Sequence, residues 1–319
     1  MIKKLISVSL LLMTAQFSIA APPDNFNQAR NMVRVIYEDR SRTLYCGCRI
    51  EWNQRTGTSG KIDHQSCGYN IRSPQSANAV SRANRVEVEH IVPISWIGSQ
   101  FQCGNRSECR ASSPAYNLAE ADLHGLAPAI GEVNMDRSNY RFGMVRGVPP
   151  QYGQCDFAVN FTDRVAEPAD HLKGKIARLH FYYADHYGLN MSRQQQQLMM
   201  AWHKQFPVSV WEKERDLRIK SFMGHSNPFV TGEKEWSIDF KPSLKGLSML
   251  NAEKVNEVAK THGSPYELSA PILGNSSSKI YHLPEGCPSY SRINLNNAVQ
   301  FFSEDEAVKN GYRKAGNCR

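Results

Sequence analysis

Eight cysteines constrain this chain more than any other feature of its sequence; they are residues 46, 48, 67, 103, 109, 155, 287 and 318. An even number of cysteines in an exported protein favours a fold held together by disulfides. The six cysteines up to residue 155 allow 15 pairings, and proximity in the sequence favours only Cys103 with Cys109. Cys46 and Cys48 form C-x-C, so a C-x-x-C redox motif is not indicated. The pairing of the other four stays open.

Residues 1–20 indicate that the protein is exported. Lys3 and Lys4 precede an apolar run, and the segment ends in small residues at Ala20. This pattern predicts a secretory signal peptide cut after Ala20. A transmembrane anchor is the alternative, but the run is short and no later segment approaches ~20 consecutive apolar residues. We therefore expect a secreted or periplasmic protein that is monomeric and does not insert into a membrane.

The mature chain is long enough for more than one folded unit. We expect a main domain over residues 21–240, a linker over 241–270, where the structure signals weaken, and a small module over 271–319. Loss of the signal peptide removes two of 38 basic residues and none of the 30 acidic ones, so the net charge is +6. A basic surplus suits a polyanionic partner such as nucleic acid.

The main domain mixes helix and strand signals and is predicted to be α+β. Helical spacing covers 25–38, strand patterns cover 43–51 and 84–92, and residues 93–120 are predicted to be rich in loops, with a short turn closed by Cys103 and Cys109. Three further helices are indicated, two of them by capping boxes that start at Ser192 and Ser209.

The segment VEVEHIVPIS, residues 86–95, places Glu89 and His90 side by side. The alternation before them is typical of a half-buried strand, in which neighbouring side chains point to opposite faces. Both side chains can serve one site only if the strand ends or kinks there. Pro93 is suited to end it, because proline cannot donate to a strand ladder.

A helix is predicted after Gly131, and Asn134 lies inside it although asparagine is a poor interior residue for a helix. One carboxylate, one imidazole and one carboxamide on a basic chain fit metal-assisted phosphodiester hydrolysis. Mg²⁺ prefers oxygen ligands and often takes only one or two protein groups, so Glu89 and Asn134 would suffice. Each residue also has a structural alternative: a hydrogen-bonded histidine, a surface strand glutamate and a helix cap.

Several segments resemble the bacterial endonuclease I family of periplasmic and secreted nucleases, which carry a ββα-metal (His-Me finger) motif. The resemblance runs from about residue 27 to 230 and rests on EVEHIVPISWIG, EADLHGLAPAIGEVNMDRSNYRFG, RVAEP, GKIARLHFYYADHYGLNMSRQQQQLMMAWHKQFPV and WEKERDLRIKSFMGHSNPFV. It implies a mixed α/β nuclease with a ββα-metal core.

The resemblance also implies roles for individual residues. His90 would be the general base, Glu89 and Asn134 would hold a single Mg²⁺, and Arg106 would steady phosphate charge. Glu120, His124, Arg137 and Asn139 lie in the same patch as candidate supporting residues, and for them support of the loop or helix and contact with the substrate both stay open. The family cuts DNA, and often RNA, to products with 5′-phosphates.

No helix-turn-helix or zinc-finger signature is present, so little sequence specificity is expected. A non-catalytic nucleic-acid-binding or DNA-uptake protein is the alternative from another class. A metalloprotease is not indicated, because the chain lacks H-E-x-x-H.

Two cysteine patterns depart from families that this chain resembles. The endonuclease I family commonly has a cysteine where this chain has Lys213. The last segment, from GNSSSKIYHLPEGCPSYSRI onwards, resembles the four-cysteine zinc domain of the Ada DNA-repair protein, but Ser291 and Ala315 replace two of those cysteines. Two thiolates are too few for a closed zinc site. We therefore expect a disulfide between Cys287 and Cys318, and no zinc.

Overall fold

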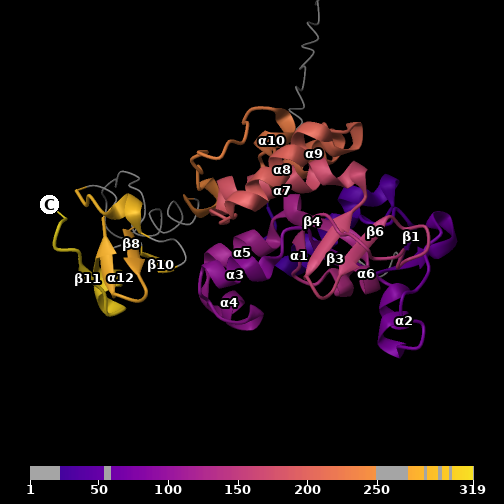
Figure 1. Ribbon diagram of the computed structural model, residues 1–319, viewed down its shortest axis with the longest axis horizontal. Coiled ribbons are helices and arrows are strands. Elements are labelled where there is room, and N and C mark those ends of the chain that lie inside the picture. The colour runs from indigo at the N-terminus through magenta and orange to yellow at the C-terminus, as the bar shows by residue number, and fades with distance from the viewer. Residues whose placement is uncertain are drawn as a thin grey trace, which may run out of the picture.

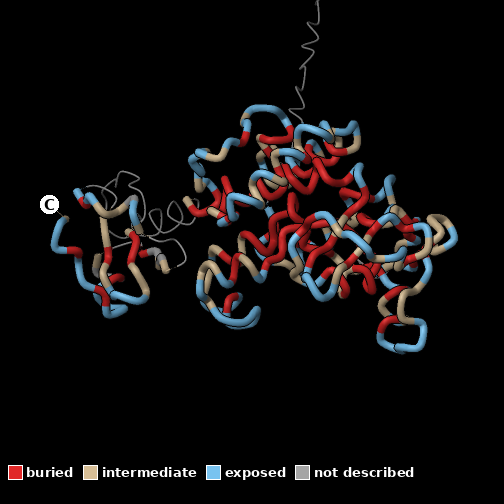
Figure 2. The backbone as a smooth tube through the Cα atoms, in the orientation of Figure 1, coloured by how far each residue is buried: buried red, intermediate tan, exposed pale blue. Residues whose placement is uncertain are grey.

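The structure is a computed structural model that describes residues 22–53, 59–248, 272–283, 286–293, 297–301 and 304–318. The predicted signal peptide and most of the predicted linker lie outside these residues. Two hydrophobic cores are present, one in the large body up to residue 248 and one in the tail. In Figure 2 the buried residues run through the interior of the large body.

The large body is α+β, with three small sheets and ten α-helices in its described part. The sheets pair β1 (Arg49–Trp52) with β2 (Gly60–Asp63), β3 (Val86–His90) with β4 (Leu126–Ile130), and β7 (Val165–Pro168) with β5 (Arg141–Phe142) and β6 (Phe157–Asn160). The helices are α1 (Phe26–Tyr37), α2 (Ala77–Ala83), α3 (Ile94–Gln100), α4 (Arg106–Ser112), α5 (Pro114–Ala121), α6 (Gly131–Arg137), α7 (Asp170–Tyr187), α8 (Arg193–Gln205), α9 (Val210–Met223) and α10 (Pro228–Thr231).

Helix α7 is the central element of the body and is buried from Leu172 to Tyr187. Of the two predicted capping boxes that follow it, the serine half of each is present, whereas the side chains of Gln195 and Glu212 bind Phe142 and Arg178 instead. Ser192 accepts a hydrogen bond from the backbone of Gln195 at the start of α8, and Ser209 does the same for Glu212 at the start of α9. These caps satisfy backbone N–H groups that a helix start leaves without partners, so the predicted helix starts are confirmed.

The prediction that residues 93–120 are loop-rich is wrong, because this stretch forms α3, α4 and α5. The start signals are in the sequence. Asn105 and Glu108 form a reciprocal capping box, and Ser113 caps α5 ahead of Pro114 in its first turn. The Cys103–Cys109 disulfide therefore ties a loop to a helix and does not close a hairpin-like turn.

The predicted strand over 43–51 is shorter than expected. Residues 43–48 form a tight turn in which Gly47 donates to the carbonyl of Thr43 and takes a φ of 67°. A positive φ suits glycine and is incompatible with a strand. The two cysteines of this turn form disulfides with different parts of the chain: Cys46 is bonded to Cys155, and Cys48 is bonded to Cys67.

Strands β3 and β4 are antiparallel, with Glu89 opposite Ala127 and His90 opposite Leu126. Helix α6 follows β4 without a loop, since Ile130 ends the strand and is the N-cap of the helix. Figure 1 shows the two strands side by side with α6 next to them. This strand-strand-helix unit carries Glu89, His90 and Asn134.

The tail is a four-stranded sheet with one short helix in its described part. The strand order is β10 (Ala298–Phe301), β8 (Ile272–Asn275), β9 (Ile280–His282), β11 (Arg313–Lys314), and the helix is α12 (Glu304–Lys309). A disulfide joins Cys287 to Cys318.

The start of the predicted linker is packed on the large body, because the backbone of Leu244 and that of Ser243 both donate to Asp185 on α7. Within the described part of the chain, no helix combines the length and the apolar character that crossing a bilayer requires.

Candidate active site on the β3–β4–α6 unit

Arg137 fixes the end of β3. From the last position of α6, its guanidinium donates to the backbone carbonyls of His90, at 2.9 Å, and of Ile91. The same group lies 3.1 Å from a carboxylate oxygen of Glu89. The strand ends at His90, and Ile91 then bonds to the carbonyl of Gly125. Glu89 and His90 are therefore the last two residues of the strand.

The ring of His90 has one nitrogen bound and one nitrogen without a partner. Nε2 lies 3.0 Å from the backbone carbonyl of Glu120. A carbonyl only accepts, so Nε2 carries the proton and Nδ1 has its lone pair. In the described part of the chain Nδ1 has no hydrogen-bond partner. It is also not fully enclosed by protein atoms. Nδ1 can therefore accept a proton.

Phe26, the first residue of α1, stacks on His90 with ring centroids 4.8 Å apart. Burial lowers the pKa of His90 to about 4; the hydrogen bond to the Glu120 carbonyl opposes this shift, and the positive charges of Arg106 and Arg137 add to it. The ring is consequently neutral at physiological pH.

Glu89 is buried and strongly held. Its Oε1 accepts from the hydroxyl of Tyr45 at 2.6 Å and faces Arg137, so both side-chain partners use the same oxygen. Burial raises the pKa of Glu89, while the charge of Arg137 and the hydrogen bond from Tyr45 oppose the shift. Oε2 takes neither of these side-chain bonds.

Asn134 lies in the middle of α6, one turn before Arg137, and its Nδ2 donates to Glu87 at 3.0 Å. Glu87 is two residues before Glu89 and therefore on the same face of β3. No described residue donates to Oδ1 of Asn134. An amide whose nitrogen is held in this way presents its oxygen, which is the atom a hard cation would bind.

Arg106 and Arg110, both on α4, bind opposite oxygens of the Glu120 carboxylate through their Nε atoms, at 2.6 and 2.7 Å. Burial of Glu120 opposes ionisation, but the hydrogen bonds from Arg110 and Arg106 outweigh it and lower the pKa of Glu120. The two guanidiniums also lie over the Phe26 ring. Arg106 and Arg110 stay partly exposed, so a cationic edge borders His90.

Two of the predicted supporting residues lie elsewhere. His124 is buried against the backbone carbonyl of His225 and near Asp216, and burial lowers its pKa to about 3. The side chain of Asn139 accepts from Arg164 on the surface. The structure brings Glu120 and Arg137 to the site but gives neither His124 nor Asn139 a contact with His90 or Glu89.

Four residues that contact the site were not predicted from the sequence: Tyr45, Phe26, Glu87 and Arg110. Tyr45 and Phe26 lie in segments 44 and 64 residues away from their partners, so no local pattern points to them. Glu87 could have been found, because the alternation that places Val86 and Val88 on one face places Glu87 beside Glu89.

The fold and the site bring together a neutral histidine, a buried carboxylate and the side-chain oxygen of an asparagine, with two partly exposed arginines beside the histidine. The model of the Endonuclease I family matches residues 26–233.

The relatives point the same way. An extracellular deoxyribonuclease of Aeromonas hydrophila is 41% identical over 217 residues, covering 67% of this chain and 92% of the relative. A periplasmic deoxyribonuclease of the same organism is 40% identical over 230 residues, covering 71% and 93%. An endonuclease-1 of Buchnera aphidicola is 39% identical over 211 residues, covering 65% and 82%. The chain belongs to the endonuclease I family.

Proposed function

We propose that this protein is a secreted or periplasmic, Mg²⁺-dependent endonuclease that hydrolyses DNA with little sequence specificity and leaves 5′-phosphate ends. The same reaction would also cleave the phosphodiester bonds of RNA. The β3–β4–α6 unit would be its ββα-metal core. The observation that supports the proposal is the state of His90 at the end of β3: its Nε2 is bound to a carbonyl, while no described residue bonds to its Nδ1.

His90 would be the general base. Its Nδ1 takes a proton from the water molecule that attacks the phosphorus atom. The carbonyl of Glu120 keeps the proton on Nε2. The hydrogen bond between them becomes stronger when the ring becomes cationic. Phe26 restricts rotation of the ring by stacking on it, so the free nitrogen keeps its direction.

Glu89 and Asn134 would together hold one magnesium ion. Oε2 of Glu89 and Oδ1 of Asn134 are both oxygens that their side-chain neighbours leave without a bond, and one or two protein oxygens are typical of a Mg²⁺ site. A bound ion supplies polarisation of the scissile phosphate and neutralises charge on the leaving 3′ oxygen. Tyr45 and Arg137 hold the carboxylate so that its second oxygen keeps its place.

Arg106 would bind a phosphate oxygen of the substrate. Its Nε is used by Glu120, but about half of its side chain is exposed, at 48%, and a guanidinium has further N–H groups to donate. Anchoring one edge of the guanidinium reduces the entropy lost when the other edge binds phosphate.

The place and substrate of the reaction rest on the predicted signal peptide and on relatives named as extracellular or periplasmic deoxyribonucleases. Four disulfides in the described part of the chain fit an oxidising compartment.

Nicking of supercoiled plasmid by the oxidised mature protein tests this function. We expect cleavage with Mg²⁺, none with excess EDTA, and nicks that DNA ligase seals without prior kinase treatment, because ligase needs a 5′-phosphate. Cleavage that survives EDTA would contradict the metal requirement. Tight DNA binding without nicking would favour the non-catalytic binding protein.

A further inference from the structure

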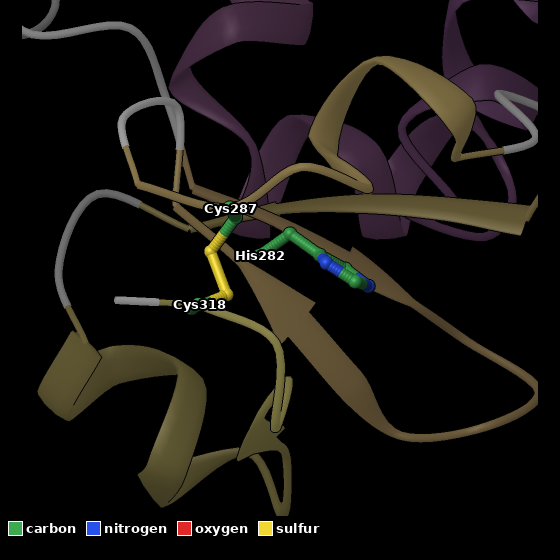
Figure 3. A group of neighbouring side chains, drawn as sticks. All are labelled: His282, Cys287 and Cys318. Carbon is green, nitrogen blue, oxygen red and sulfur yellow. A yellow bond between two sulfur atoms is a disulfide. The ribbon is translucent and has the colours of Figure 1, made fainter.

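The tail contains a cluster of side chains that the proposed nuclease activity does not use. A ring nitrogen of His282 and the sulfur atoms of Cys287 and Cys318 all lie within 4.8 Å of one another. Figure 3 shows the three side chains together, with His282 at the end of β9 and the two cysteines joined by their disulfide. In the described part of the chain, no other group of three histidine, cysteine or acidic side chains meets the same criterion.

The surroundings of the cluster are those of a ligand site. Among the residues that the structure describes, Nδ1 of His282 is enclosed and has no hydrogen-bond partner. Most enclosed polar atoms have a partner, so an exception calls for a missing ligand or a special role. Cys287 is 7% exposed, and its sulfur accepts a hydrogen bond from the backbone of Leu283 at 2.9 Å. A backbone donor at a cysteine sulfur favours the negatively charged thiolate over the thiol.

The two cysteines of the tail are too few by themselves for a closed zinc site. His282 is a third donor of the type that zinc accepts, and three protein ligands with one open position make a stable zinc site. Tetrahedral zinc, with bonds of about 2.3 Å to sulfur and about 2.0 Å to nitrogen, places its ligand atoms about 3.5–3.8 Å apart. The ring nitrogen of His282 and both sulfurs already lie within 4.8 Å of one another, so the two sulfurs need to separate by only a few ångströms once the S–S bond is broken.

We propose that the tail holds a redox-gated site for a thiophilic divalent cation such as Zn²⁺, formed by His282, Cys287 and Cys318 when their disulfide is reduced. In the oxidised protein the two sulfurs are bonded to each other and cannot act as thiolate ligands. A dithiol reductant breaks the S–S bond with two electrons and is itself oxidised to a disulfide, which leaves two thiols. Binding of the cation then releases both thiol protons.

The consequence is that the tail is cross-linked in either redox state. The disulfide ties the chain after β9 to the end of the chain when the protein is oxidised. The cation makes the same connection when the protein is reduced. A small module needs such a link, because its core consists of only four buried residues, Tyr281, Phe301, Ala307 and Tyr312, in the described part of the tail.

Titration of the full-length protein with Co²⁺ tests the proposal. The protein is reduced with a phosphine under anaerobic conditions, excess Mg²⁺ is added to fill oxygen-ligand sites, and the thiolate-to-cobalt charge-transfer absorption is followed. The double variant Cys287→Ser/Cys318→Ser is the matched control, since it keeps the six cysteines of the nuclease body. We expect the reduced wild type to bind one more Co²⁺ than this control, and the oxidised wild type to show no thiolate absorption.

The variant His282→Asn tests whether the side chain of His282 binds the cation. The affinity of this variant for Co²⁺ should fall by at least tenfold. Removal of a residue that only hydrogen-bonds a metal ligand already causes a loss of about this size. Because the disulfide is intact before reduction, the thermal transition and plasmid nicking of the oxidised variant report whether it folds, and His282→Gln replaces it if it does not. Equal binding by the wild type and the double variant, or binding by both His282 variants as tight as that of the wild type, would overturn the proposal.

Discussion

At the scale of single residues, Arg137 is the side chain on which the site depends most. It is 1% exposed and binds the carbonyls of His90 and Ile91 together with the carboxylate of Glu89. It also stacks over Phe142, with 4.6 Å between Cζ and the ring. The sequence identified Arg137 only as a possible supporting residue, because its role comes from contacts with a strand more than 40 positions earlier.

Arg137→Met should lower the free energy of unfolding by about 3–5 kcal/mol, because it leaves the Glu89 carboxylate buried without its partner. Urea denaturation of the oxidised protein measures this. Arg164→Met is the matched control, since Arg164 is exposed, and its loss should cost less than about 1 kcal/mol. A cost for Arg137→Met as small as that of the control would mean that Glu89 does not rely on this charge.

At the scale of elements, the sequence predicts well where local signals agree. Helix α1, helices α7 to α9 and strand β3 follow from periodicity and caps. Prediction fails at 93–120, where weak apolar periodicity conceals three short helices, and at 43–48, where Gly47 breaks the strand pattern. Glu89 and His90 could be chosen from sequence, whereas Tyr45 and Phe26 could not, because only tertiary packing brings them there.

The turn at 43–48 connects a disulfide to the site. Tyr45 bonds to Glu89 and is next to Cys46, which is bridged to Cys155. Cys46→Ser/Cys155→Ser should therefore slow plasmid nicking and lower stability by about 2–5 kcal/mol. The double variant Cys287→Ser/Cys318→Ser should leave nicking unchanged. Wild-type nicking rates in a folded Cys46→Ser/Cys155→Ser variant would show that this disulfide does not order the site.

At the scale of the whole molecule, buried histidines make stability depend on pH. Burial is the largest cause that lowers the pKa of His90, His180 and His186 to about 4 each, and of His124 to about 3. In the unfolded chain these groups titrate near 6.5. Between about pH 6.5 and 4 the unfolded state therefore binds more protons, so stability falls as the pH falls through this window.

His180→Gln tests this dependence at one fully buried position. His180 lies on α7, with Nδ1 bonded to the carbonyl of Ile176, and glutamine can keep such a bond. The slope of unfolding free energy against pH, measured near pH 5, should decrease by about 1 kcal/mol per pH unit in the variant, which is close to one proton. An unchanged slope would show that His180 titrates alike in the folded and unfolded states.

The sequence predicts a nuclease body and a tail, because the helix and strand signals weaken over residues 241–270 between them. The family match ends at residue 233, so the tail lies outside it. Residues 241–248 nevertheless pack on α7. Composition did not indicate this contact, since it depends on Asp185, a buried residue on a distant helix.

The central claim is that His90 supplies the base for hydrolysis. It is tested most directly by measuring DNA cleavage and DNA binding on the same preparations of His90→Ala and of His171→Ala, an exposed histidine on α7. We expect cleavage by His90→Ala to fall by about 10²- to 10⁴-fold while DNA binding and the thermal transition stay near those of the wild type, and His171→Ala to match the wild type throughout. Near-normal cleavage by His90→Ala would contradict the assignment of the base.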